Sequence, residues 1–142
     1  MMSHMVNQFE LCDQADIMRS YGANEIFFMD SAGALLPSDI KKRLKYIASP
    51  TGFHPHNNLG LAVANGLTAV EAGATMIDGT TRGLGAGAGN CPLEVLVPVL
   101  HKMGYETGID EEALFDCAEY IRSQFPPQEI IPLSITSGLS GV

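Results

Sequence analysis

Two histidines, His54 and His56, stand one residue apart in the stretch GFHPHNNLGLAVANG. Side chains at positions i and i+2 of an extended segment point to the same side, so both imidazoles can reach one point in space. Imidazole is a common metal ligand, and two histidines with one carboxylate form a site that keeps open positions for substrate. The spacing therefore favours a divalent-metal site over two unrelated polar residues at the end of a strand.

Two aspartates, Asp30 and Asp78, are candidates for the carboxylate that would complete this site. Each ends a short apolar run, EIFFMD at 25–30 and TMID at 75–78. An alternative stays open, because an aspartate at a strand end can instead accept hydrogen bonds from the amides of the following loop. Ser31 directly follows the first of these runs and could donate its hydroxyl to a ligand. No base signature accompanies it, so a nucleophile is not predicted there.

A glycine-rich stretch, GLGAGAGN at 83–90, follows the last of these runs. It loosely matches a dinucleotide fingerprint, but that motif belongs to the first strand–helix turn of a fold, so the context disfavours nucleotide binding. The glycines instead indicate a backbone that passes close to a ligand or to a neighbouring loop. We expect Asn90 to cap the next helix, whose N-terminus would favour an anion such as a substrate carboxylate.

The elements that must position these residues repeat along the chain. Buried strands of a parallel sheet are expected at the short apolar runs, which are MMSHM at 1–5 and the segments 25–30, 51–54 and 75–78. A helix is expected after each run, in the segments 7–21, 37–48, 59–72 and 93–103. His4, Asp30, His56 and Asp78 then mark the successive strand ends.

This repetition of strand and helix predicts the fold class α/β. About four βα units are present, either as an open doubly wound sheet or as a partial (β/α)8 barrel. An extra C-terminal helix is expected at 111–123, with Asp110 as its N-cap and Leu114 in its apolar stripe. In both architectures function resides at the carboxyl ends of the strands, where the unusual polar residues of this sequence lie.

Composition excludes several classes of protein. A chain of 142 residues with 46 % hydrophobic residues has enough apolar material for one core. The formal net charge is −8, and the cluster Lys41–Lys45 is best explained as a solvated helix face, so no nucleic-acid partner is expected. No apolar run reaches the roughly 18 residues of a membrane span, and the start lacks the pattern of a signal peptide. We therefore expect a cytoplasmic protein.

Taken together, the motifs resemble those of the 4-hydroxy-2-oxovalerate aldolases, which are metal-dependent pyruvate aldolases with a TIM-barrel fold. The resemblance covers the whole chain and is carried by MMSHM, DSAGALLPSDI, GFHPHNNLGLAVANGLTAVEAGAT and DGTTRGLGAGAGNCPLEVLVPVL. The pattern His-x-His-Asn is shared with relatives such as isopropylmalate synthase, whereas MMSHM, DSAG and GAGAGN in combination point to the aldolases. The resemblance implies that residues 1–142 form a single partial aldolase barrel domain containing strands 5 to 8.

The resemblance also implies roles for individual residues. His54 and His56 match the two histidine ligands of a divalent metal, usually Mn²⁺, with Mg²⁺ or Co²⁺ as alternatives. His54 and Ser31 match substrate-binding residues. The implied reaction is aldol cleavage of 4-hydroxy-2-oxovalerate to pyruvate and acetaldehyde, with the metal stabilising the pyruvate enolate. The implied partners are a small 2-oxo acid substrate and an acylating acetaldehyde dehydrogenase.

Several family features have no counterpart in this sequence. The arginine, the metal-binding aspartate and the base histidine of the family lie near its first strand, so no catalytic residue is assigned here. SPTGF is also a poor strand for the placement of His54. Three hypotheses stay open: an aldolase that is active when the missing barrel half is supplied, an inactive half-barrel that binds metal weakly and self-associates through exposed sheet edges, and a fragment of a Claisen enzyme similar to isopropylmalate synthase.

Overall fold

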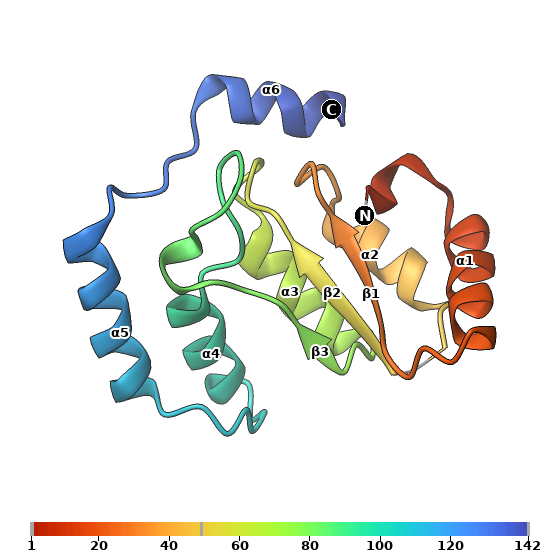
Figure 1. The fold of residues 1–142 in the computed structure, drawn as a ribbon, viewed down its shortest axis with the longest axis horizontal. Coiled ribbons are helices and arrows are strands. Elements are labelled where there is room, and N and C mark those ends of the chain that lie inside the picture. Colours follow the sequence, from red (N-terminus) through yellow and green to blue (C-terminus); the bar gives the residue numbers. More distant parts are fainter. Residues whose placement is uncertain (1, 49, 142) are drawn as a thin grey trace.

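The computed structural model describes residues 2–48 and 50–141. Its elements are, in order, η1 (Ser3–Met5), α1 (Gln8–Ser20), β1 (Ile26–Asp30), α2 (Pro37–Leu44), β2 (Thr51–Pro55), α3 (Ala62–Glu71), β3 (Met76–Ile77), η2 (Thr81–Gly83), α4 (Leu93–Lys102), α5 (Glu111–Gln124) and α6 (Pro132–Ser140). The three strands form one parallel sheet in the order β1-β2-β3, with α2 and α3 behind it in Figure 1. The predicted alternation of strands and helices in an α/β fold is confirmed.

The sheet buries one face against α2 and α3. Phe28 of β1 and Phe53 of β2 are register partners, and their rings stack with centroids 4.5 Å apart. Both belong to the buried core, together with Ile40 of α2. Burying each such side chain contributes roughly 1.5–3 kcal/mol. Because side chains alternate along a strand, Met29 and His54 belong to the opposite face, and no described helix lies in front of that face in Figure 1.

Strand β2 is well formed from Thr51 onward, although the sequence SPTGF is unfavourable for a strand; Ser49 lies outside the described residues. All five residues of β2 have a register partner on β1. Gly52 makes this pairing possible, because a Cβ atom at this position would lie 2.4 Å from the ring of Phe27 on the neighbouring strand. The side chain of His54 is thereby fixed on a paired strand.

The expected strand end at MMSHM is instead the short 3-10 helix η1; Met1 lies outside the described residues. Met2, directly before η1, has a left-handed backbone with φ 56°, which is incompatible with a continuing strand. The segment is joined to β1 by side-chain contacts rather than by a ladder, since the Ser3 hydroxyl donates to the carbonyl of Met29 at 2.8 Å. The sheet of the described residues therefore has three strands and not four.

Two helices have the N-cap residue that the sequence predicts, and a third helix has a different one. Asn7 and Glu10 form the predicted capping box of α1, and the Asp110 carboxylate caps α5 as predicted. Asn90 does not cap α4. Pro92 occupies that position, and the buried Asn90 amide donates to the carbonyl of Leu84 at 3.0 Å within the glycine-rich loop. None of the described helices combines the length and the apolar character that crossing a bilayer would need.

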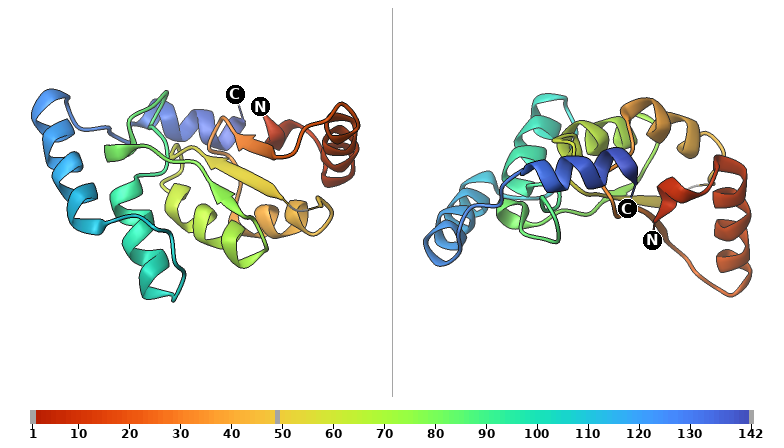
Figure 2. Two further views of the ribbon diagram at one scale, coloured as in Figure 1. Left: turned by 60° about the horizontal axis from the view of Figure 1, so that its bottom comes forward. Right: turned by 90° about the horizontal axis from the view of Figure 1, so that it is seen from above.

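Helix α6 was not expected from the sequence. Its residues PLSITSGLS contain no charged side chain and several serine, threonine and glycine residues, which are poor helix formers. The helix begins with Pro132 in its first turn, and the Ser134 hydroxyl bonds both the amide and the carbonyl of Ile131. Figures 1 and 2 show α6 lying across the carboxyl ends of the strands, where the end of α6 approaches η1.

Candidate functional site

The predicted site residues lie at the carboxyl ends of neighbouring parallel strands. Ser31 directly follows β1, while His54 lies on β2 and His56 directly follows it. Asp78 directly follows β3, which pairs with β2. These four residues therefore share one rim of the sheet, the rim that α6 crosses.

The two histidines face each other, and each is oriented by a second contact. Their ring centroids are 5.1 Å apart and the rings are tilted by 59°. His54 Nδ1 lies 3.3 Å from Oδ2 of Asp78, and His56 has a backbone hydrogen bond with Ala86. Each contact engages one ring nitrogen and leaves the other for a ligand, which is how metal-binding histidines are usually held.

The electrostatics of His56 favour its neutral form. Burial, and secondly the nearby His54, lower the pKa of His56 below its ordinary value. A neutral imidazole is the form that binds metal ions, so near neutral pH the proton is a weak competitor at this position. The residues present thus fit a divalent cation at the two histidines.

The two aspartates left open by the sequence have different environments. Asp30 is fully buried, and its carboxylate accepts hydrogen bonds from the amides of Ala34 at 2.9 Å and Leu35 at 3.0 Å. Burial raises the pKa of Asp30, although these two bonds oppose the shift. Asp30 therefore holds the loop that follows β1, whereas Asp78 is 52 % exposed and faces His54.

The ligand set of the rim is incomplete within the described part of the chain. No three His, Cys, Asp or Glu side chains of residues 2–48 and 50–141 gather in a way that could hold a metal ion. A metal ion held by His54 and His56 would therefore need its remaining ligands from water, substrate or other residues.

Ser31 is held in an orientation that suits ligand binding. Its Oγ accepts a hydrogen bond from the backbone amide of Met2 at 3.0 Å, and its side chain is half-buried. Because the oxygen acts as the acceptor in this contact, the hydroxyl hydrogen can be donated to an oxygen of a ligand.

The glycine-rich loop passes close to the loop that carries the histidines. The Asn57 amide donates to the carbonyl of Gly89 at 2.8 Å, and the Ala88 amide donates to the side chain of Asn58 at 3.3 Å. A Cβ atom on Gly87 would lie 2.9 Å from Asn58 Oδ1. Close approach to a neighbouring loop is therefore the reason for the glycines, one of the two explanations that the sequence left open.

Replacing Gly89 by alanine is expected to destabilise the fold more than replacing Gly104, a matched control. Both residues have φ +88°, where any L side chain costs about 1–2 kcal/mol. At Gly89 the new Cβ would also lie 2.0 Å from the carbonyl oxygen of Gly83, whereas at Gly104 nothing lies within 4 Å. The extra overpacking should add about 1–3 kcal/mol to the loss in free energy of unfolding, measured by urea denaturation. Equal losses would show that this loop is not closely packed.

Sequence reasoning missed Arg82, which lies on η2 after the end of β3. It has a left-handed backbone with φ 62°, unusual for a residue other than glycine. Its amide donates to Glu94 Oε2 at 2.9 Å, and its guanidinium lies 3.6 Å from Oε1 of the same carboxylate. A cation in a strained conformation beside a strand end is a feature that sequence spacing alone does not reveal.

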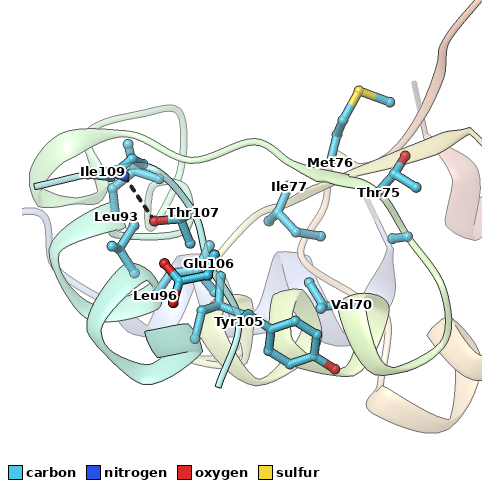
Figure 3. A pocket seen from close by; sticks show the side chains of 13 residues that line it. Val70, Thr75, Met76, Ile77, Leu93, Leu96, Tyr105, Glu106, Thr107 and Ile109 are labelled. Atoms are coloured by element: carbon cyan, nitrogen blue, oxygen red, sulfur yellow. Dashed lines mark hydrogen bonds between the residues drawn. The ribbon is translucent and has the colours of Figure 1, made fainter. Parts of the chain in front are cut away.

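A cavity of about 430 Å³ lies beside β3, away from the rim. Figure 3 shows Ile77 of β3, Val70 of α3 and Leu96 of α4 around it, with Tyr105 nearby. None of Ser31, His54 and His56 lines it. Since β3 pairs only with β2 among the described residues, this apolar groove adjoins the outer edge of the sheet.

Comparison with known proteins gives consistent relatives. The 4-hydroxy-2-oxovalerate aldolase of Pectobacterium atrosepticum is 53 % identical over an alignment of 148 residues. The alignment covers 100 % of this chain and 43 % of the relative. The enzyme of the same name from Carboxydothermus hydrogenoformans is 49 % identical, with 100 % of this chain and 44 % of the relative covered. The chain thus spans less than half the length of these curated relatives.

Solved structures show the same fold. The HMG-CoA lyase of Bacillus subtilis matches with a TM-score of 0.79 and 25 % identity, over 92 % of this chain and 48 % of that one. The HMG-CoA lyase of Acinetobacter baumannii in complex with coenzyme A and 3-methylmalate matches with a TM-score of 0.78 and 26 % identity, over 91 % of this chain and 46 % of that one. The family profile described as HMGL-like matches residues 1–121, and the chain therefore belongs to the HMGL-like family, whose fold is the TIM barrel.

Proposed function

We propose that this chain is part of a divalent-metal-dependent aldolase that cleaves 4-hydroxy-2-oxovalerate to pyruvate and acetaldehyde. One observation carries the proposal: the paired imidazoles of His54 and His56 lie at a strand end, in a chain about half identical to enzymes named for that reaction. Residues 1–142 would act as one partial barrel domain, corresponding to strands 5 to 8 if the MMSHM segment is counted as a strand position.

The residues at the rim have complementary roles in this proposal. His54 and His56 would hold the cation, and Asp78 would orient the imidazole of His54. Ser31 would donate its hydroxyl to the 2-oxo acid, which His54 would also contact. A bound Mn²⁺, or alternatively Mg²⁺ or Co²⁺, supplies Lewis-acid polarisation of the 2-oxo group.

The reaction also requires groups that we assign to no residue of this chain. A base must remove the proton of the C4 hydroxyl; the C3–C4 bond then breaks, and its electron pair passes to the pyruvate enolate. We infer that a further part of the barrel supplies this base. The apolar groove at the outer edge of β3 (Figure 3) is where such a part could extend the sheet, because strand edges and apolar grooves accept added strands.

The proposed partners follow from the same reasoning. They are the 2-oxo acid substrate, the missing barrel half or a second copy of the chain, and an acylating acetaldehyde dehydrogenase that takes up the aldehyde. The proposed location is the cytoplasm.

Complementation tests the proposed function. The chain is co-purified with the part of the Pectobacterium atrosepticum aldolase that it does not match, and pyruvate release from 4-hydroxy-2-oxovalerate is measured with Mn²⁺. We expect no release from the chain alone and release from the complex. The variant His54→Ala should remove the activity, whereas His101→Ala, a histidine of α4, should retain it. A complex that forms without activity would favour the inactive half-barrel, and activity that survives His54→Ala would contradict the assigned role.

A further inference from the structure

His4 of η1 is a buried histidine that the proposed reaction does not use. Its side chain is 7 % exposed, and its Nε2 lies 2.8 Å from the carbonyl oxygen of Gly141 at the end of α6. Because a carbonyl oxygen can only accept, Nε2 must carry the proton in this contact. The other nitrogen, Nδ1, is buried without a hydrogen-bond partner among the described residues and lies 3.9 Å from Oδ1 of Asp30.

Asp30 lies beside this imidazole and also holds the loop that follows β1. The same carboxylate accepts the amides of Ala34 and Leu35, so it fixes the loop that begins with Ser31. Asp30 is fully buried, and burial raises the pKa of its carboxyl, although hydrogen bonds and the nearby imidazoles of His4 and His56 oppose that shift. A buried carboxylate is costly unless neighbouring groups compensate it, and His4 is one of these neighbours.

The backbone of η1 is fixed from two directions, so the imidazole of His4 has a defined place. The Ser3 hydroxyl donates to β1, and the Met2 amide donates to Ser31 Oγ. From the other side, the buried guanidinium of Arg43 on α2 donates to the carbonyls of Ser3 at 3.3 Å and Val6 at 3.0 Å.

Helix α6 itself buries little apolar surface on the rim. Leu133 is 73 % exposed and Leu139 is 76 % exposed. Gly138 is a position of close packing, where a Cβ atom would lie 2.8 Å from Leu59. A polar contact at the end of the helix is therefore a large part of what holds it across the strand ends (Figure 2).

We propose that His4 is a positioning residue of the rim: its imidazole, which lies beside Asp30, binds the C-terminal end of α6 and thereby holds α6 across the carboxyl ends of the strands. This role of His4 rests on the proposed function only in that the rim is treated as the reaction site. The contact itself follows from the fold.

Amide hydrogen exchange of the whole chain tests this role. In His4→Ala the amides of α6 should exchange about two- to tenfold faster, the effect of losing one hydrogen bond, while those of α5 stay unchanged. His4→Gln offers a side-chain N–H to Gly141 and should restore part of the protection. His101→Ala is the matched control: it removes the contacts to Glu111 and Thr107 and should affect α4 and α5 but not α6.

A second readout does not depend on the stability of any variant. Nitrogen NMR of the unaltered chain should show the His4 proton on Nε2, either alone or together with a proton on Nδ1. A proton on Nδ1 alone would overturn the proposal, as would unchanged exchange of α6 in His4→Ala or equal acceleration in every element. None of these readouts uses aldolase activity, so an inactive complemented enzyme would contradict the proposed function and leave the role of His4 intact.

Discussion

The purified chain is expected to sediment as a dimer, as a larger species or as a molten ensemble, rather than as a compact monomer. The open face of the sheet carries Phe27, Met29 and Met76, and the outer edge of β3 adjoins an apolar groove. Each large apolar side chain left in water forgoes roughly 1.5–3 kcal/mol. Several of these together are comparable with the whole stability of a domain, about 5–15 kcal/mol. Exposed strand edges and apolar faces of this kind promote association with other chains.

Sedimentation velocity over a range of concentrations, together with thermal unfolding, measures this association. Addition of the complementary barrel part serves as the control, because it should cover the same surfaces and replace self-association by a defined complex. A monodisperse monomer with a sharp cooperative unfolding transition would show that the argument from the open sheet is wrong.

The chain alone is expected to bind Mn²⁺ weakly, and both His54→Ala and His56→Ala should abolish this binding. Weak binding follows because the described residues offer only part of a ligand set. Asp78→Asn should weaken binding by about 10–100-fold, since Asp78 orients His54 rather than binding the metal in this arrangement. Calorimetric titration measures the affinities, with His101→Ala as the control. Unchanged binding in the double variant would remove both histidines from the site.

Acid should weaken the same binding. Metal and proton compete for an imidazole, so the contribution of His56 to the affinity should be complete at and above the ordinary histidine pKa of 6.5 and should fall as the pH decreases. Because burial lowers the pKa of His56, its contribution should be lost only below that value. Titrations across this range measure the effect, and an affinity that rises on acidification would contradict binding by imidazole.

Local signals in the sequence predicted much of the fold. The caps of α1 and α5 depend on residues three or fewer positions apart, Asn7 with Glu10 and Asp110 with the amides that follow it. The segment MMSHM could not be assigned in this way. Its conformation depends on contacts with β1 and with Arg43, which are distant in sequence.

The candidate site could be predicted where the alternation of side chains along a strand determines the direction in which they point. The i, i+2 spacing predicted that the imidazoles of His54 and His56 point to the same side, and their ring centroids lie 5.1 Å apart. The same periodicity places Asp30 on the face of Phe28, the buried face, which is why its carboxylate serves the loop instead of the rim. The pairing of Arg82 with Glu94 and the docking of α6 depend on tertiary contacts and gave no comparable signal.

Pulsed EPR of Mn²⁺ bound to the chain labelled with ¹⁵N-histidine tests most directly whether the end of β2 carries part of a metal site. We expect hyperfine coupling to two histidine nitrogens in the unaltered chain, and no histidine coupling in either His54→Ala or His56→Ala, because neither variant should bind the metal. An absence of histidine coupling in the unaltered chain, or couplings that persist in the double variant, would contradict a metal site at these two histidines.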